Sequence, residues 1–111
     1  MNNDDAVHLR YMLDAIEQLE RYTRGMSESE FLSRPMVQDA VARQIEIVGE
    51  AAKNLSAEFQ DLHPKLPWLK TIGIHSKIVR EDYKLNTDIV WDTVQDDLPL
   101  LKHTIRKLLQ A

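Results

Sequence analysis

The sequence has 111 residues, a length that suits one hydrophobic core and is too short for two. Its 43% hydrophobic and 29% charged residues are typical of a globular domain, and the absence of Cys excludes disulfides, thiolate metal sites and cysteine nucleophiles. The net charge of −4 argues against a general nucleic-acid coat protein, although residues 63–111 carry 8 Lys and Arg against 6 Asp and Glu. We expect one soluble, cytoplasmic domain over residues 1–111, because neither a signal peptide nor an apolar run of about 18 residues is visible.

Apolar residues recur with a helical period in the first third of the chain. The first stripe runs through residues 9–19 and is followed by Gly25, a residue type typical of a helix C-terminus. Ser27 with Glu30 three positions later is typical of a capping box that opens a short helix. The sequence therefore predicts one long helix and one short helix in this region.

The longest stripe covers residues 37–55 and begins just after Pro35, which is tolerated in the first turn of a helix. Gly49 lies inside it, at a cost of about 1 kcal/mol relative to Ala. We therefore expect Gly49 to permit the close approach of another helix or a ligand. Ser56 opens a brief third segment, which "HPKLPW" ends because each Pro disfavours helix in the residue before it.

The second half predicts two further helices. One begins near Pro67 and runs through Ile78, and a loop then leads to Asn86 or Thr87 as the cap of the last helix. That last helix bends near Pro99 and continues toward the end of the chain. No alternating strand pattern is present, so we predict an all-α, four- to five-helix antiparallel bundle.

Paired carboxylates are one candidate for chemistry. Glu46 and Glu50 lie one helical turn apart and share a face, where they form either the edge of a groove or ordinary surface charges. No Glu-x-x-His repeat accompanies them, as a di-metal bundle would require. His8, His63 and His103 have no partner at metal-ligand spacing, so we interpret them as surface or loop residues and expect no metal site.

The segment "HSKIVREDY" is the second candidate. On a continuous helix His75 and Arg80 would lie about 140° apart, so they can converge only if the helix ends near Val79 or if two copies meet across a dimer. The residues alone favour the solvated end of a helix.

Five ordered blocks connect the chain to a known family: "AIEQLERYTRGMSESEFL", "QDAVARQIEIVGEAAKNL", "HPKLPW", "IG" and "TDIVWDTVQDDLPLLK". In this order and spacing the chain resembles the HepT-like HEPN domains, the toxins of type VII HEPN–MNT toxin–antitoxin systems. The resemblance implies a HEPN-like bundle that forms a homodimer and cleaves tRNA or mRNA without metal or cofactor. It also implies an MNT-type nucleotidyltransferase antitoxin as partner, which attaches AMP to a motif tyrosine, and no membrane association.

The family motif is an Arg, four residues, a His, one residue and a Tyr, located just after "IG". Aligned without a gap, His75 occupies the Arg position and Arg80 the His position, so the two catalytic residue types are exchanged. The supporting or modification candidates are Ser76, Lys77, Asp82, which occupies the Tyr position, and Tyr83, one residue further on.

The resemblance gives the two exchanged residues separate roles. RNA supplies its own nucleophile, the 2′-OH, so His75 would transfer the proton and Arg80 would hold the phosphate. Misplacing a catalytic group by about 1 Å costs about 100-fold, so the exchange leaves an alternative open. In that alternative, the chain is an inactive HEPN dimer that binds the nucleotidyltransferase, RNA or a nucleotide without cleavage. For the dimer itself we expect an apolar flank around Trp68, Ile72 and Ile74 to need cover.

Overall fold

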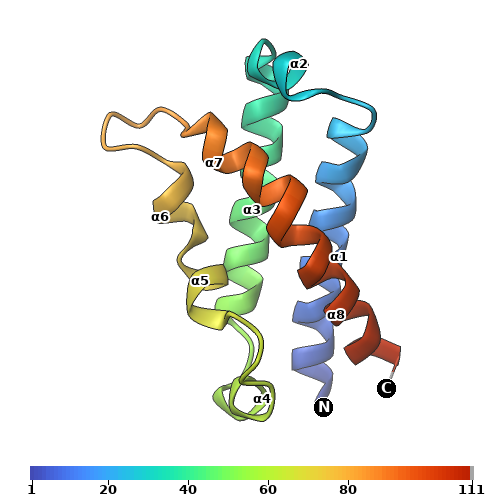
Figure 1. Cartoon of the computed structure of the whole chain (residues 1–111). Helices are drawn as coiled ribbons and strands as arrows, with labels where there is room; N and C mark the ends of the chain where they lie inside the picture. Colours follow the sequence, from blue (N-terminus) through green and yellow to red (C-terminus); the bar gives the residue numbers. More distant parts are fainter. Residues whose placement is uncertain (111) are drawn as a thin grey trace.

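The computed structural model describes residues 1–110, except for the side chain of Leu69. The described residues form an all-helical bundle (Figure 1), which confirms the predicted fold class. The helices in chain order are α1 (Asn3–Thr23), α2 (Glu28–Leu32), α3 (Pro35–Lys53), α4 (Ala57–Leu62), α5 (Trp68–Ile72), α6 (Ile74–Ile78), α7 (Thr87–Asp92), the π-helix η1 (Thr93–Asp97) and α8 (Leu98–Gln110). None of the described helices is both long enough and apolar enough to cross a membrane.

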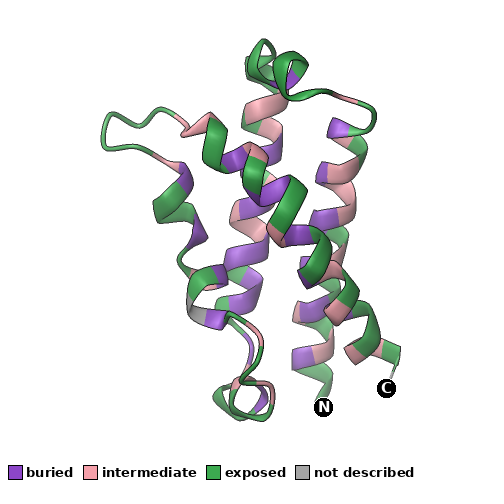
Figure 2. Ribbon diagram, viewed as in Figure 1, coloured by how far each residue is buried: buried purple, intermediate pink, exposed green. Residues whose placement is uncertain are grey.

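The core forms where the antiparallel helices α1 and α3 pack against each other (Figure 1), with α7 lying over α3 and α8 over α1. Figure 2 shows the buried positions on the facing sides of these helices and exposed positions on the outer sides. Lys102 and Arg106 fasten α8 to α1, through contacts of 2.6 Å with Glu20 and 3.3 Å with Glu17. The largest fully buried side chains are Phe31, Leu9, Met12, Ile16, Leu19, Ile45, Ile78, Leu98, Ile105, Val41, Val48 and Val90.

Local sequence signals account for several of the helix ends. Gly25 follows α1 with a φ of 73°, a conformation that costs glycine little. Ser27 caps α2 in the predicted capping box, and Glu30 accepts in return from the Ser27 backbone N–H at 3.2 Å. That backbone hydrogen bond, the Ser27 hydroxyl and the nearby Arg34 lower the pKa of Glu30 from its ordinary value.

A buried carboxylate that the sequence analysis missed joins the starts of two helices. Asp5 is 3% exposed and accepts hydrogen bonds from the backbone N–H and the hydroxyl of Ser56, at 2.8 and 2.7 Å. The same hydroxyl accepts from Phe59 N and so caps α4. Asp5 therefore holds the first turn of α1 against the first turn of α4, a pairing that no spacing in the sequence reveals.

The second half departs from the predicted helices in two places. The single helix expected from Pro67 to Ile78 is divided into α5 and α6 at Gly73, the residue with the weakest helix propensity in this segment. The last helix widens into η1 just before Pro99, a change of helix type that was not predicted. Pro99 has no N–H to donate to the preceding turn, and the wider turn accommodates this loss. Asn86 lies at the cap position of α7 but makes no side-chain capping bond.

The apolar flank expected to need a partner is covered within the chain. Trp68 and Ile74 are each 6% exposed and Ile72 is partly buried. The Trp68 ring packs edge-on against Phe59, and its Nε1 donates to the carbonyl oxygen of His63 at 2.9 Å. This flank therefore gives no reason to expect a dimer.

The other expectations for single residues are met with one exception. Val94 and Leu98 are buried and the ring centroid of Trp91 lies 5.3 Å from that of Phe31, so this stripe belongs to the core. His103 is exposed and His63 follows α4 in a loop. His8 differs, because it is partly buried and its Nδ1 has no hydrogen-bond partner among the described residues.

Candidate functional site

The candidate site begins where α6 ends. Val79 adopts an extended conformation and pairs with Leu85 in an isolated antiparallel bridge, so the chain turns back on itself over residues 80–84. Arg80 N donates to Lys84 O at 2.8 Å, and Tyr83 N donates to Arg80 O at 2.9 Å. We call residues 80–84 the hairpin. A loop was predicted between Ile78 and Asn86, but its folding into a hairpin was not.

Tyr83 lies at the tip of the hairpin with a φ of 65° and is 91% exposed. A turn followed by one residue in the left-handed region is a common way to close a three-residue hairpin loop. That residue is usually Gly or Asn, and a bulkier residue there costs about 1–2 kcal/mol. Because Tyr is not a residue type that signals a left-handed turn position, the sequence did not predict this turn. The turn places the Tyr83 side chain in solvent.

His75 lies on α6 at the edge of a cleft. Its Nδ1 is 3.2 Å from Glu46 Oε1 on α3, and Glu46 also contacts Arg43 at 3.5 Å. The His75 side chain is 55% exposed. The cleft has a volume of about 300 Å³ and is lined by Arg43, Glu46, Gly49, Glu50, Ile72 and His75. The structure therefore brings together three of the predicted site residues, His75 and the two glutamates, in one hollow.

Gly49 explains how α5 and α6 come close enough to α3 to form this cleft. A Cβ at this position would lie 3.2 Å from the carbonyl oxygen of Thr71 and 3.4 Å from the Ile74 side chain. The helix approach expected at Gly49 is therefore present. Arg43 and Ile72 also line the cleft and were missed, although the three-residue spacing of Arg43 and Glu46 is a signal for a contact on one helix face.

Arg80 takes a different partner from His75. Its Nη2 lies 3.2 Å from Asp82 Oδ2 within the hairpin, and its side chain is 58% exposed. Helix α6 does end next to Val79, which was one condition for His75 and Arg80 to converge. The two side chains nevertheless pair with separate carboxylates, His75 with Glu46 and Arg80 with Asp82. Ser76 and Lys77 lie exposed on α6 between them.

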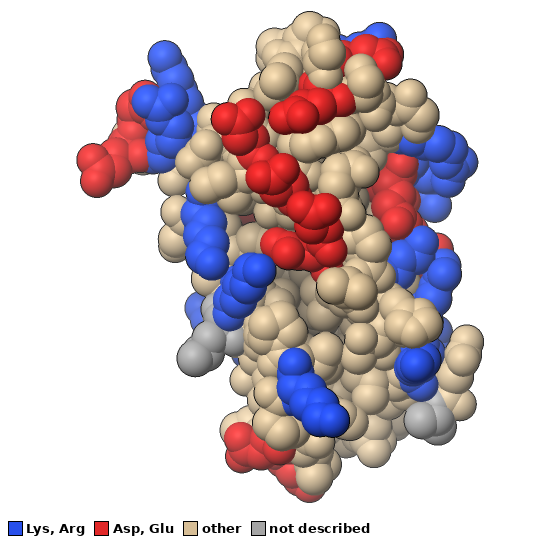
Figure 3. Space-filling model, in the orientation of Figure 1, with Lys and Arg blue, Asp and Glu red and all other residues tan. Residues whose placement is uncertain are grey.

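The surface charge around the site is uneven. Figure 3 shows a band of acidic side chains along the face formed by α7 and η1, with Lys, Arg and acidic atoms mixed at the hairpin. Asp88, Asp92 and Asp96 follow one another at intervals of four residues, and all three are exposed. A polyanion would be repelled by that face and would meet the site from the side of α6 and the hairpin. This band was not predicted, although the four-residue spacing of its aspartates is a signal in the sequence for one charged helix face.

The chemistry available at the cleft is proton transfer. An imidazole whose Nδ1 contacts a carboxylate presents Nε2 to an incoming group, and such a carboxylate orients the ring. At the hairpin the available chemistry is anion binding, because a guanidinium presents paired donors that match a phosphate. Among the described residues no three His, Asp or Glu side chains gather as a metal site would require.

The fold and the site define a small all-α domain that carries an exposed His–Glu pair on one side of α6 and an Arg-bearing hairpin after it. The family model described as "Ribonuclease HepT-like" matches residues 12–108. The chain belongs to this HepT-like ribonuclease family.

Three relatives illustrate the similarity. The chain is 36% identical over 101 residues to "Probable ribonuclease HepT" of Thermococcus cleftensis, covering 91% of the chain and 92% of the relative. It is 34% identical over 103 residues to a "Putative RNase" of Caldanaerobacter subterraneus subsp. tengcongensis, covering 93% and 92%. It is also 34% identical over 110 residues to a "Gamma-glutamylcyclotransferase and putative RNase" of Methanocaldococcus jannaschii. That match covers 99% of the chain but 50% of this longer relative. No solved structure matches the chain significantly.

Proposed function

We propose that the chain is a metal-independent RNA endonuclease, the toxin of a HEPN–MNT toxin–antitoxin pair. The observation that carries this proposal is the contact between His75 Nδ1 and Glu46 in the cleft, in a member of a ribonuclease family. A histidine held by a carboxylate is suited to take a proton from one oxygen and return it to another. Glu46 acts as a positioning residue, which holds the ring without touching the substrate.

Cleavage then follows from the chemistry of RNA itself. His75 removes the proton from the 2′-OH, and the resulting oxygen attacks the adjacent phosphorus. A 2′,3′-cyclic phosphate forms, the bond to the 5′-oxygen breaks, and the leaving 5′-oxygen takes the proton that His75 removed from the 2′-OH. Arg80 stabilises the negative charge that accumulates on the phosphate, after exchanging its contact with Asp82 for one with the substrate.

We propose a homodimer as the form in which these two roles are divided between protomers. Since His75 and Arg80 pair with separate carboxylates in one chain, we propose that Arg80 of one protomer serves a phosphate at His75 of its partner. Sedimentation at micromolar concentration is expected to give a dimer. A monomer there, in a preparation that still cleaves RNA, contradicts the shared site.

The second candidate is an inactive dimer that binds the nucleotidyltransferase antitoxin, RNA or a nucleotide without cleaving. It is favoured by the exchange of the motif's Arg and His, and by the ion pair that occupies Arg80. In either case Tyr83 is the residue we propose as acceptor of AMP from the antitoxin. Its position at the hairpin tip, 91% exposed, supports this role, because an acceptor hydroxyl must enter another enzyme's active site.

Incubation of the purified protein with tRNA and with mRNA in EDTA separates the two candidates. The ribonuclease is expected to give discrete fragments that end in a 2′,3′-cyclic phosphate, at rates that added Mg²⁺ does not change. Activity that EDTA abolishes and a divalent cation restores would contradict the proposed mechanism. Intact RNA, together with stable binding of the chain to its nucleotidyltransferase, supports the inactive dimer.

A further inference from the structure

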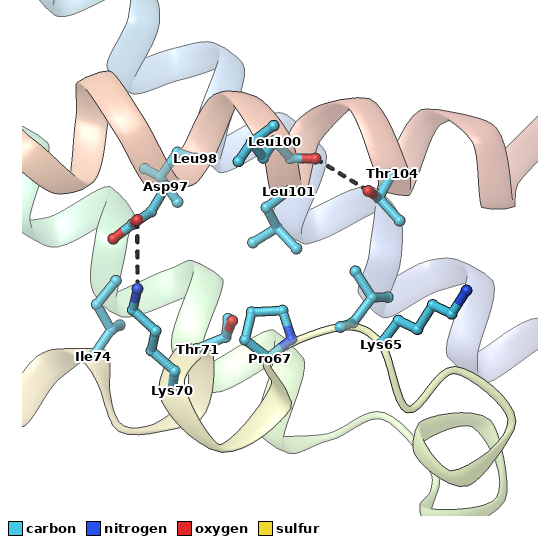
Figure 4. Close-up of a pocket in the computed structure, with 11 residues that line it drawn as sticks. Lys65, Pro67, Lys70, Thr71, Ile74, Asp97, Leu98, Leu100, Leu101 and Thr104 are labelled. Carbon is cyan, nitrogen blue, oxygen red and sulfur yellow. Dashed lines mark hydrogen bonds and ion pairs between the residues drawn. The ribbon is translucent and has the colours of Figure 1, made fainter.

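A second hollow, unrelated to the ribonuclease mechanism, lies between α5 and α8 (Figure 4). We call it the α5–α8 pocket. Its walls are apolar, with Pro67 and Ile74 on one side and Leu98 and Leu101 on the other, and its volume is about 330 Å³. This volume falls at the lower end of the ~300–1,000 Å³ typical of sites for small molecules, and apolar walls with few polar groups are typical of such sites.

One polar group in this pocket has no partner. Thr71 is only 6% exposed, and its hydroxyl makes no side-chain hydrogen bond among the described residues. Thr104, across the pocket, differs because its hydroxyl donates to Leu100 O at 3.1 Å. In Figure 4 the Thr71 oxygen is directed into the gap between the α5 and α8 sides. The hydroxyl is not fully enclosed, because the fully buried polar side-chain atoms without a partner among the described residues comprise His8 Nδ1 alone, so a polar group of a ligand in the pocket can reach the Thr71 hydroxyl and bond to it.

The ends of the pocket carry two lysines in different states. Lys70 is paired with Asp97 at 3.4 Å and so closes one end. Lys65 lies exposed at the other end and makes no ion pair among the described residues (Figure 4). A ligand in the pocket therefore meets Lys70, whose charge Asp97 neutralises, and Lys65, whose charge is available. This combination favours a ligand with a single negative charge.

From these three observations we propose that the α5–α8 pocket binds a small aryl carboxylate. The ring lies between the leucines of α8 and the Pro67–Ile74 side. A polar substituent on the ring bonds to the Thr71 hydroxyl, and the carboxylate pairs with Lys65. The pocket is separate from the His75 cleft, and this proposal stands whether or not the chain cleaves RNA.

Calorimetric titration with 3-(4-hydroxyphenyl)propionate tests the proposal on the whole chain. We expect saturable binding of one molecule per chain. Lys65→Ala is expected to weaken it about fivefold, the value of one exposed ion pair. Thr71→Val, which keeps the shape and removes the hydroxyl, is expected to weaken it by a similar factor. Lys107→Ala on α8, an exposed lysine outside the pocket, is expected to change nothing.

The uncharged analogue, 3-(4-hydroxyphenyl)propanamide, supplies the second comparison. The amide is expected to bind the wild-type chain about fivefold more weakly than the acid does. To Lys65→Ala the acid and the amide are expected to bind with equal affinity. Circular dichroism on each variant establishes that the helices are retained. Lack of saturable binding up to millimolar acid overturns the proposal, and so does equal binding of acid by the wild type and by both pocket variants.

Discussion

His75→Ala is expected to lower the rate of RNA cleavage by about 100-fold or more, the usual contribution of a general acid–base group. The loss should depend on pH, because a general base removes a proton only in its unprotonated form. The remaining activity should therefore vary little with pH, while the wild type shows a marked dependence. Single-turnover cleavage of one tRNA, measured from pH 5 to pH 9, gives both quantities.

His103→Ala is the matched control for this experiment. His103 is also exposed but lies on α8, away from the cleft and the hairpin, so its removal is expected to leave rate and pH profile unchanged. If His75→Ala cleaves as fast as His103→Ala, the His75–Glu46 pair is not the proton-transfer site. If the wild type also cleaves RNA as slowly as His75→Ala, the inactive-dimer candidate replaces the ribonuclease mechanism.

Arg80→Ala is expected to slow cleavage by about 100-fold at every pH, because the charge that develops on the phosphate loses its partner. It should also reduce the salt dependence of RNA binding, by about one unit in the slope of log K against log salt. Arg80→Lys is expected to restore the slope more fully than the rate, since an ammonium keeps the charge but not the paired donors.

Arg34→Ala controls for the loss of any exposed, ion-paired arginine. Arg34 contacts Glu30 at 3.8 Å and is 55% exposed, against 58% for Arg80, but it lies between α2 and α3. Filter binding and cleavage with the same RNA are expected to show no change for Arg34→Ala. An equal effect of both substitutions would mean that Arg80 contributes general charge rather than a phosphate contact in the site.

The features that the sequence predicts correctly are those that depend on neighbouring residues. The core stripes of α1 and α3, the Ser27–Glu30 capping box and the turn at Gly25 each follow from spacings of a few residues. These interactions act within one helix or one turn, so a periodic pattern is enough to find them.

The features that the sequence did not predict depend on contacts between distant segments. The His75–Glu46 pair forms between α6 and α3, where Gly49 lets α5 and α6 approach α3 closely. The covered Trp68 flank likewise depends on tertiary packing rather than on local periodicity. The hairpin has no Gly or Asn at its left-handed position, so the usual turn signal is missing at Tyr83.

The two tryptophans make the cooperativity of this bundle measurable. Trp68 is buried beside α4, whereas Trp91 is partly buried against Phe31 of α2, and α2 and α4 flank opposite ends of α3. Trp91→Phe leaves fluorescence from the α4–α5 end alone, and Trp68→Phe leaves fluorescence from the α2–α7 end alone. Coincident urea transitions in the two variants would mean that the ends unfold as one unit. An earlier transition at one end would identify it as a separately opening part of the domain, with its own local stability.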